Sequence, residues 1–346
     1  MTDMYRRLAA AAPSLHVAVV LLTGWMAATP VSAQAPAGVQ RRSASVGRVP
    51  RTSDGRPDLQ GVWSFAWATP LERTDQFANK PVLTDAEAAR FLKGLPAGGC
   101  RFIKCDGSAQ NRLESAYDDS WYDPGSTLAD NRTSLIVDPP DGRVPPMTPE
   151  ARQQVAEARA QDRGRALIDG PEQATLVDRC LVGFNSGPPM NPSAYNNMVQ
   201  ITQTSRYVVI YNEMVHNSRI VPLDGRPLPP SDMRLLTGVS RGRWEGDTLV
   251  VETSHFRRDS VVGPSGHSSI DPDHFRLVER FSRTAAGLQY EYTMHDPRTW
   301  TKPWTVRVPM RASDEPIYEY ACHEGNHSMP NRLAAARAAD GRTPSK

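Results

Sequence analysis

The sequence predicts a mainly β protein in which about nine antiparallel strands form a meander that closes into a lipocalin-like barrel. Two observations support this class. Short segments rich in β-branched and aromatic residues follow one another from Met198 onward, separated by turn-forming residues. Several of them, such as 288–295, alternate apolar with polar residues, so that one face of the strand is buried and the other is wet. A few helices are expected in the N-terminal half, and a short one at the C-terminus.

Residues 1–33 are expected to form a secretory signal peptide. Arg6 and Arg7 precede a stretch of mostly small and apolar residues, and residues 31–33 supply a small-x-small cleavage site. Residues 34–56 are polar, small and arginine-rich, which is typical of a flexible leader. The protein is therefore expected in the periplasm or outside the cell, with no membrane attachment after cleavage.

Residues 57–180 are expected to contain the first strand and then a segment that wraps the barrel. The first strand is expected at 58–65, and its Gly61–Trp63 matches the Gly-x-Trp opening seen in lipocalin-like barrels. Residues 133–138 are also strand-like, because β-branched and aliphatic side chains are followed there by a proline- and glycine-containing turn.

Helices are expected at three places in this wrapping segment. Thr84 and Glu87 have the spacing of a capping box, which predicts a helix from Thr84 to Leu92. A longer helix is expected from Thr148 to about Ala166. A shorter helix is expected just before Cys180.

Residues 181–330 are expected to form the barrel and 331–346 a helix and tail, with 57–346 making one domain. Glu245–Asp247 and Thr284–Gly287 contain glycine between strand-like segments, which predicts two hairpins. The C-terminal helix is expected at 331–339. The barrel strands are expected at 198–204, 207–215, 218–223, 241–244, 248–253, 275–283, 288–295, 304–310 and 317–322.

The four cysteines of an exported protein predict two disulfides. Sequence alone does not separate the three possible pairings. The preferred pairing joins Cys100 to Cys105, which flank a four-residue insert, and Cys180 to Cys322. The second bridge would tie a helix end to the last strand.

The run from Tyr318 to His327 allows two interpretations. His323-Glu324-x-x-His327 matches the zinc-protease pattern, in which a helix presents two imidazoles to the metal and the glutamate activates its water. Gly325 and Asn326 are poor helix formers, and the aromatic residues before Cys322 predict a strand that ends there instead.

The strand interpretation is favoured, so no cofactor is expected. Under the zinc alternative, His323 and His327 are the candidate metal ligands. The zinc alternative requires a helix over 322–328. It also requires a third ligand from earlier in the chain, such as His295 or His216.

Polar residues that interrupt apolar strand faces are the candidate catalytic residues. Glu279 lies between Leu277 and Phe281 on one face, where burial would raise the pKa of its carboxyl group and suit it to acid–base catalysis. The alternative is a structural ion pair with an arginine such as Arg219 or Arg307.

Four further residues share this catalytic interpretation. Glu213 shares a strand face with Val209 and Tyr211, and His216 lies on the opposite face. His295 ends a strand at the expected barrel rim, and His323 ends the last strand with its ring directed inward. The residues expected to contact the ligand are Asn326, Arg219 and Tyr292.

Four long segments resemble a widespread family of uncharacterised secreted bacterial proteins. The resemblance spans most of the chain after the signal peptide and implies secretion, but it implies no particular reaction or site. The segments are 55–63 (GRPDLQGVW), 131–142 (NRTSLIVDPPDG), 241–253 (RGRWEGDTLVVET) and 318–326 (YEYACHEGN).

The charge composition narrows the classes of binding partner that we expect. The formal net charge is +2, which gives no reason to expect nucleic acid or an anionic membrane as a partner. The favoured function is a periplasmic acid–base enzyme, a lyase, isomerase or hydrolase, that acts on a small molecule without a cofactor. The alternatives are a non-catalytic ligand carrier with the same barrel and a zinc-dependent hydrolase centred on His323, Glu324 and His327.

Overall fold

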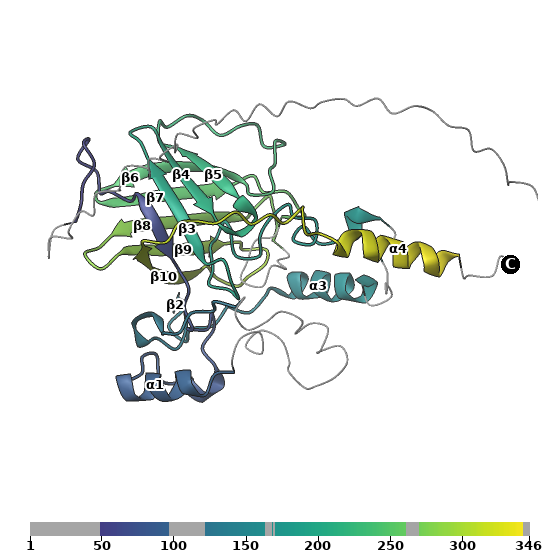
Figure 1. Ribbon diagram of the computed structural model, residues 1–346, viewed down its shortest axis with the longest axis horizontal. Helices are drawn as coiled ribbons and strands as arrows, with labels where there is room; N and C mark the ends of the chain where they lie inside the picture. Colours follow the sequence, from purple (N-terminus) through teal and green to yellow (C-terminus); the bar gives the residue numbers. More distant parts are fainter. Residues whose placement is uncertain (1–48, 97–121, 163–167, 169, 261–269, 342–346) are drawn as a thin grey trace, which may run out of the picture. The chain divides into compact units, whose positions relative to one another are not determined.

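One ten-stranded antiparallel sheet forms the body of the protein (Figure 1). The computed structural model describes residues 49–96, 122–162, 168, 170–260 and 270–341. The expected signal peptide, most of the expected leader and Cys100 and Cys105 lie outside these residues. The strands are β1 (Gly61–Ser64), β2 (Ile136–Asp138), β3 (Met198–Gln203), β4 (Tyr207–Asn212), β5 (Ser218–Pro222), β6 (Val239–Glu245), β7 (Thr248–Ser254), β8 (Arg276–Arg283), β9 (Leu288–His295) and β10 (Trp304–Ser313).

The strand order is β5-β4-β3-β1-β10-β9-β8-β7-β6, so two meanders meet at the N-terminal strand. β1 pairs with β3 on one side and with the last residues of β10 on the other. β2 pairs with the first residues of β10 on that same edge, while β9 pairs along the opposite edge. Both edges of β10 are therefore occupied.

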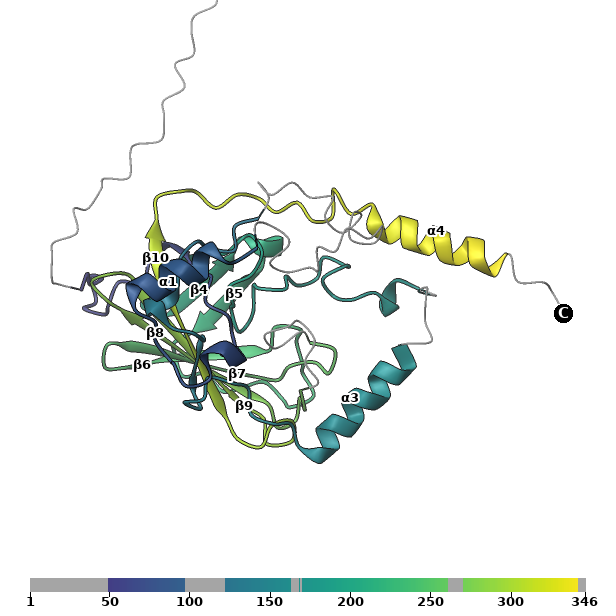
Figure 2. The same cartoon turned by 90° about the horizontal axis from the view of Figure 1, so that it is seen from below.

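The sheet is strongly curved. β5 and β8 are six steps apart in the strand order, which would separate them by about 29 Å in a flat sheet with strands about 4.8 Å apart. Yet the Arg219 side chain of β5 contacts the Glu279 carboxylate of β8 with an N–O distance of 2.8 Å. The sheet therefore folds over on itself, with β4 and β5 on one side and β6 to β9 on the other (Figure 2).

The two edge strands, β5 and β6, approach each other without closing the barrel. A Cβ atom on Gly242 of β6 would lie 2.6 Å from Leu223 and 2.8 Å from Val221, so a glycine is needed for this close approach. No backbone pairing joins β5 to β6 among the described strands. The predicted antiparallel, mainly β fold is confirmed, but the closed lipocalin-like barrel is not.

Large side chains fill the concave side of the sheet. The predicted alternation is confirmed over 288–295 in β9 and 304–310 in β10, where every second side chain is buried. Both predicted hairpins form, with Gly246 at a φ of 60° in the first of them. The largest fully buried side chains include Trp63, Trp304, Tyr290, Tyr292, Phe65, Phe256 and Phe281.

The described residues include three α-helices, which lie outside the sheet: α1 (Asp85–Lys93), α3 (Pro149–Asp162) and α4 (Ser328–Asp340). The predicted capping box of α1 is confirmed, since Thr84 accepts a hydrogen bond from the Glu87 N–H and the Glu87 carboxylate accepts one from the Thr84 N–H. The helix predicted before Cys180 is wrong, because over 170–180, which the structure describes, the only helical element is a short 3₁₀ turn, Pro171–Gln173. Within the described residues, every helix is too short or too polar to cross a bilayer.

The strand predicted at 317–322 is also wrong. β10 continues to Ser313, and residues 314–327, here called the C-terminal strap, make no strand pairing. Pro316 has no N–H for a ladder, and the Tyr318 N–H donates to the Glu213 carboxylate instead. Because both edges of β10 are already paired, the strap has no adjacent edge to join.

Candidate functional site

Glu279 is fully buried at the centre of the folded sheet, and Arg219 is its partner. The Arg219 guanidinium donates from Nη1 to Oε2 of Glu279 and from Nη2 to Oε1, the second bond at 2.8 Å. This is the fork-to-fork geometry that matches two N–H donors to two carboxylate oxygens. Of the two arginines considered from the sequence, Arg307 lies on the outer face and pairs with Glu291 at 3.0 Å.

Three hydroxyl groups complete this buried cluster. Tyr290 of β9 donates to Oε1 of Glu279 at 2.8 Å, and Ser240 and Thr253 lie 3.5 and 3.4 Å from Nη1 of Arg219. Burial, with the adjacent carboxylate, raises the pKa of Tyr290 well above its ordinary value. Burial acts to lower the pKa of Arg219, but the charge of Glu279 and the hydrogen bonds to it together outweigh burial and leave that pKa raised. We call these five residues the buried ion-pair cluster.

Two neighbouring tyrosines of β9 connect this cluster to a proline-rich loop at 187–192. The Met190 N–H donates to the Tyr290 hydroxyl at 3.2 Å, and the Tyr292 hydroxyl donates to Oδ1 of Asn191 at 2.6 Å. The loop is compact, because Gly187 has a φ of 71° and any Cβ there would lie 2.5 Å from the Pro189 backbone. The hydroxyl groups of Tyr290 and Tyr292 therefore hold the loop in place from the interior of the sheet.

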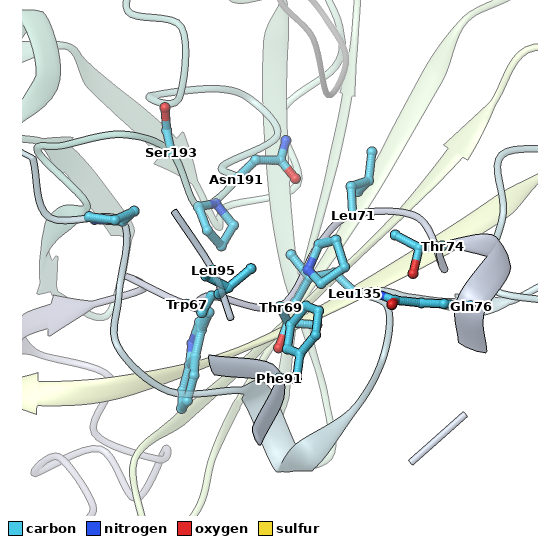
Figure 3. A pocket seen from close by; sticks show the side chains of 14 residues that line it. Trp67, Thr69, Leu71, Thr74, Gln76, Phe91, Leu95, Leu135, Asn191 and Ser193 are labelled. Carbon is cyan, nitrogen blue, oxygen red and sulfur yellow. The ribbon is translucent and has the colours of Figure 1, made fainter. Parts of the chain in front are cut away.

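This loop forms one wall of a cleft of about 420 Å³. Figure 3 shows Trp67 and Phe91 on one side of the cleft and Asn191 and Ser193 across from them. The walls come from the segment after β1, from α1 and its C-terminal end, and from the proline-rich loop. The lining residues are Trp67, Ala68, Thr69, Pro70, Leu71, Thr74, Gln76, Phe91, Leu95, Pro124, Leu135, Asn191, Pro192 and Ser193.

Hydrogen bonds to the sheet and to neighbouring loops hold the cleft walls. Trp67 donates through its indole N–H to the Pro309 carbonyl at 2.5 Å, and the guanidinium of Arg311 stacks 4.3 Å from the Trp67 ring centre. Thr69 accepts from the Ala129 N–H at 2.7 Å. These bonds give the apolar walls a fixed geometry before any ligand binds.

The segment 131–142, one of those that carry the family resemblance, has a structural role here. Asn131 donates to the Asp85 carboxylate of α1 at 2.7 Å, and Arg132 donates to the Arg307 carbonyl of β10 at 2.8 Å. Thr133 accepts from the buried Arg73 guanidinium at 3.0 Å. The segment thereby ties α1 to the sheet and so positions the helical wall of the cleft.

Glu213 and His216 do not lie on a strand, so their predicted strand faces are wrong. β4 ends at Asn212, and residues 214–216 form a 3₁₀ turn in which Val215 and His216 have positive φ angles of 58° and 41°. Glu213 is buried and accepts from the Tyr318 N–H at 3.3 Å, and burial raises the pKa of its carboxyl group. His216 is exposed, with Nδ1 3.3 Å from the Tyr320 carbonyl.

His295 ends β9 as predicted and is half-buried, opposite Arg276 of β8. Burial, with repulsion from Arg276, lowers the pKa of its imidazole. The neighbouring Asp296 caps the following turn, because it accepts from the Thr299 hydroxyl at 2.6 Å and from the Asp271 N–H at 2.9 Å. His295 is not one of the residues that line the cleft.

His323 and His327 do not form the zinc-protease geometry. Residues 323–327 are turns and coil, and α4 begins only at Ser328 with His327 as its N-cap. Both rings are exposed, so the prediction that His323 points into a barrel is wrong. Across the described part of the chain, no three His, Cys, Asp or Glu side chains are grouped to hold a metal ion.

The predicted Cys180–Cys322 disulfide is confirmed, with a Cα–Cα distance of 5.8 Å. It ties the C-terminal strap to the turn that ends at Cys180, and not a helix end to a sheet strand. Asn326 has a structural role beside it, donating to the Asp178 carbonyl at 2.8 Å and accepting from the Ser328 hydroxyl at 2.9 Å.

The structure thus joins three residues predicted from the sequence, Glu279, Arg219 and Tyr292, with two that the sequence analysis missed, Tyr290 and Asn191. The signal that could have shown Asn191 is the run Pro188–Pro192, in which four of the five residues are Pro or Asn. Such a run restricts the backbone and is typical of a rigid loop.

Comparisons of the chain with protein-family models, curated proteins and solved structures gave no match. The resemblance to a family of secreted bacterial proteins therefore stays a prediction. Function is inferred from the geometry of the cleft and of the cluster beneath it.

Proposed function

We propose that the protein is exported and binds a small organic molecule in the cleft between Trp67, Phe91 and Asn191. The observation that carries this proposal is the character of the cleft. Its volume of about 420 Å³ falls in the range of small-molecule sites, about 300–1,000 Å³. Its lining is mostly apolar and aromatic, with a few hydrogen-bonding groups at defined positions, which is the composition of such sites.

Binding without chemical change fits this lining best. The polar groups that the described residues contribute to the cleft are hydroxyls, amides and an indole, all of which stay uncharged near neutral pH. These groups orient a ligand by hydrogen bonds, whereas acid–base catalysis uses a group that titrates near the working pH. The ligand-carrier alternative is therefore the first proposal.

An acid–base enzyme is the second candidate. It is supported by the contact between the Glu279 carboxylate and the Tyr290 hydroxyl, two titratable groups in an apolar interior next to the cleft wall. A substrate would reach them only if the proline-rich loop at 187–192 moved, because Glu279 has no exposed surface. The two candidate functions differ in the fate of the ligand: a carrier releases the ligand unchanged, whereas an enzyme releases a product.

The experiment is to fill the cleft and measure binding. Ser193→Trp places an indole at the cleft wall, and Ser218→Trp places the same side chain on the exposed surface of β5 as the matched control. The probe is 2-ethylnaphthalene, an apolar ring compound, followed by its own fluorescence. We expect saturable binding to the native protein and to Ser218→Trp, and loss of binding in Ser193→Trp. Equal binding to both variants would place the ligand elsewhere and reject the proposal.

A further inference from the structure

We propose that the cleft selects an uncharged ring compound that carries a carbonyl-type oxygen, and that this oxygen accepts a hydrogen bond from Asn191. The inference rests on the proposed function and specifies the ligand class. It follows from the hydrogen-bonding state of the two most buried polar side chains in the cleft lining, Asn191 and Thr69, which are 8% and 4% exposed.

The hydrogen bond from Tyr292 sets the orientation of the Asn191 side-chain amide. The Tyr292 hydroxyl is fully buried, and its hydrogen goes to Oδ1 of Asn191 at 2.6 Å. The flipped amide would present two hydrogens to that hydroxyl and leave the hydroxyl hydrogen without an acceptor, which costs about 1–3 kcal/mol in a buried site. Oδ1 therefore faces Tyr292, and Nδ2 is the end of the amide that remains for a ligand.

The Nδ2 hydrogens of Asn191 have no acceptor among the residues that the structure describes. Nδ2 is also not among the fully buried side-chain atoms that lack a partner, so it retains some exposed surface, and Asn191 is one of the residues that line the cleft. A ligand oxygen placed against it would satisfy this donor.

Thr69 also has a side-chain hydrogen that is free to donate. Its hydroxyl oxygen accepts from the Ala129 N–H at 2.7 Å, and within the described chain its own hydrogen is not donated. The two most buried polar groups of the lining have thus used their oxygens as acceptors and have hydrogens left. The cleft offers donors, so the complementary ligand group is an acceptor.

The ligand is expected to be a ring compound because flat aromatic and proline surfaces bound the cleft. Trp67 and Phe91 lie on one side and Asn191 on the other (Figure 3), and Pro192, the residue after Asn191, also lines the cleft. Aromatic side chains contribute large apolar contact areas and favour offset or edge-on contacts with other rings.

The ligand acceptor is expected to be uncharged. The side chains that the described residues contribute to the lining include neither an arginine nor a lysine. A carboxylate moved from water into this cleft would lose its hydration without gaining an opposite charge, which is far more costly than the same transfer of a neutral carbonyl. Ketones, esters, lactones and amides on a ring fit this requirement.

Three matched probes test the inference on the native, full-length protein. They share the naphthalene ring and differ in the substituent: 2-acetylnaphthalene has a neutral acceptor, 2-ethylnaphthalene has none, and 2-naphthoate is an anion. We expect 2-acetylnaphthalene to bind about tenfold more tightly than 2-ethylnaphthalene, the effect of one buried hydrogen bond at the upper end of its usual range. We expect 2-naphthoate to bind most weakly.

A double variant assigns this preference to Asn191. Tyr292→Phe/Asn191→Leu removes the amide together with the hydroxyl that it would leave unpaired, so the wall stays apolar and satisfied. The variant is expected to bind 2-acetylnaphthalene and 2-ethylnaphthalene equally. Tyr292→Phe alone, the matched control, keeps the amide and is expected to retain part of the preference.

The outcomes separate this inference from the proposed function. If 2-ethylnaphthalene binds the native protein as tightly as 2-acetylnaphthalene, or 2-naphthoate binds best, the ligand class is wrong while the binding cleft stands. If no probe binds, both the ligand class and the proposed binding function are rejected. If the double variant does not fold, the ranking of the three probes on the native protein still decides the ligand class.

Discussion

At the scale of single residues, Glu279 shows how one side chain can support either a catalytic or a structural interpretation. Its position between Leu277 and Phe281 predicts burial, and the carboxylate is indeed fully buried. The sequence could not show that a strand six places away in the sheet would supply Arg219, because that contact depends on the curvature of the whole sheet. The sequence therefore named Arg219 and Arg307 as possible partners of Glu279 but could not choose between the catalytic and the structural interpretation.

The first prediction concerns this ion pair. Glu279→Gln leaves the Arg219 guanidinium buried without a counter-charge, and breaking one side of such a pair costs about 3–5 kcal/mol of unfolding free energy. Glu291→Gln is the matched control, since it removes a carboxylate from the more exposed pair with Arg307, which contributes about 0–1 kcal/mol. Urea denaturation of the two variants measures both values. Equal losses would contradict the assigned role of the buried pair.

The second prediction concerns the pH dependence that Glu213 gives to stability. Burial raises the pKa of this carboxyl group in the folded protein, with smaller contributions from the charges of Asp123 and Glu315. The folded state then holds a proton that the unfolded state has released, once the pH exceeds the unfolded value of about 4.3. Its contribution to stability falls as the pH rises from there through the raised folded pKa, and is constant outside that window.

Glu213→Gln removes this titration. We expect the unfolding free energy of the native protein to decrease relative to the variant as the pH rises above about 4, with the difference measured by urea denaturation at a series of pH values. A difference that does not change with pH, or that grows in favour of the native protein, would show that the pKa is not raised.

At the scale of elements, local sequence patterns correctly predicted those features that are determined by residues close together in the chain. The capping box of α1, the alternation in β9 and the two hairpins were confirmed because each is fixed within a few residues of the chain. The strand at 317–322 failed for a non-local reason, since β1, β2 and β9 already occupy both edges of β10. Glu213 and His216 were misplaced because β4 ends sooner than its apolar residues suggest.

The third prediction concerns the C-terminal strap, which the disulfide holds in place of strand pairing. Cys180→Ser/Cys322→Ser is expected to release the strap, so that proteases cleave within 314–327 at a higher rate than in the native protein. Probe binding should be unchanged, because no strap residue lines the cleft. Limited proteolysis with mass spectrometry locates the cuts. Unchanged protection of the strap would show that its hydrogen bonds alone are sufficient.

At the scale of the whole molecule, the curvature of one sheet produces both the buried ion-pair cluster and the cleft beside it. Folding the sheet over brings Arg219 to Glu279, and Tyr290 and Tyr292 extend from the same interior to the loop at 187–192. The cleft combines segments that are more than a hundred residues apart in the sequence. No local pattern predicts such a site, and the residues predicted from the sequence to contact the ligand, Asn326, Arg219 and Tyr292, do not line it.

The fourth prediction tests the approach of the two edge strands. Gly242→Ala places a Cβ within 2.8 Å of side-chain atoms of both Val221 and Leu223, and such overpacking costs about 1–3 kcal/mol of unfolding free energy. Gly325→Ala is the control, because its added Cβ would meet no atom within 4 Å, and its effect should stay within about 0.5 kcal/mol. Chemical denaturation of both variants provides the comparison. Equal stabilities would mean that β5 and β6 are not held together as described.

The central claim, that the cleft binds a ring compound through Asn191, is tested most directly by a crystal structure of the protein with 2-acetylnaphthalene. The account predicts the ring between Trp67 and Phe91 on one side and Pro192 on the other, with the ketone oxygen about 2.7–3.2 Å from Nδ2 of Asn191. An empty cleft at a saturating probe concentration, or a ring bound with its ketone turned away from Asn191, would contradict it.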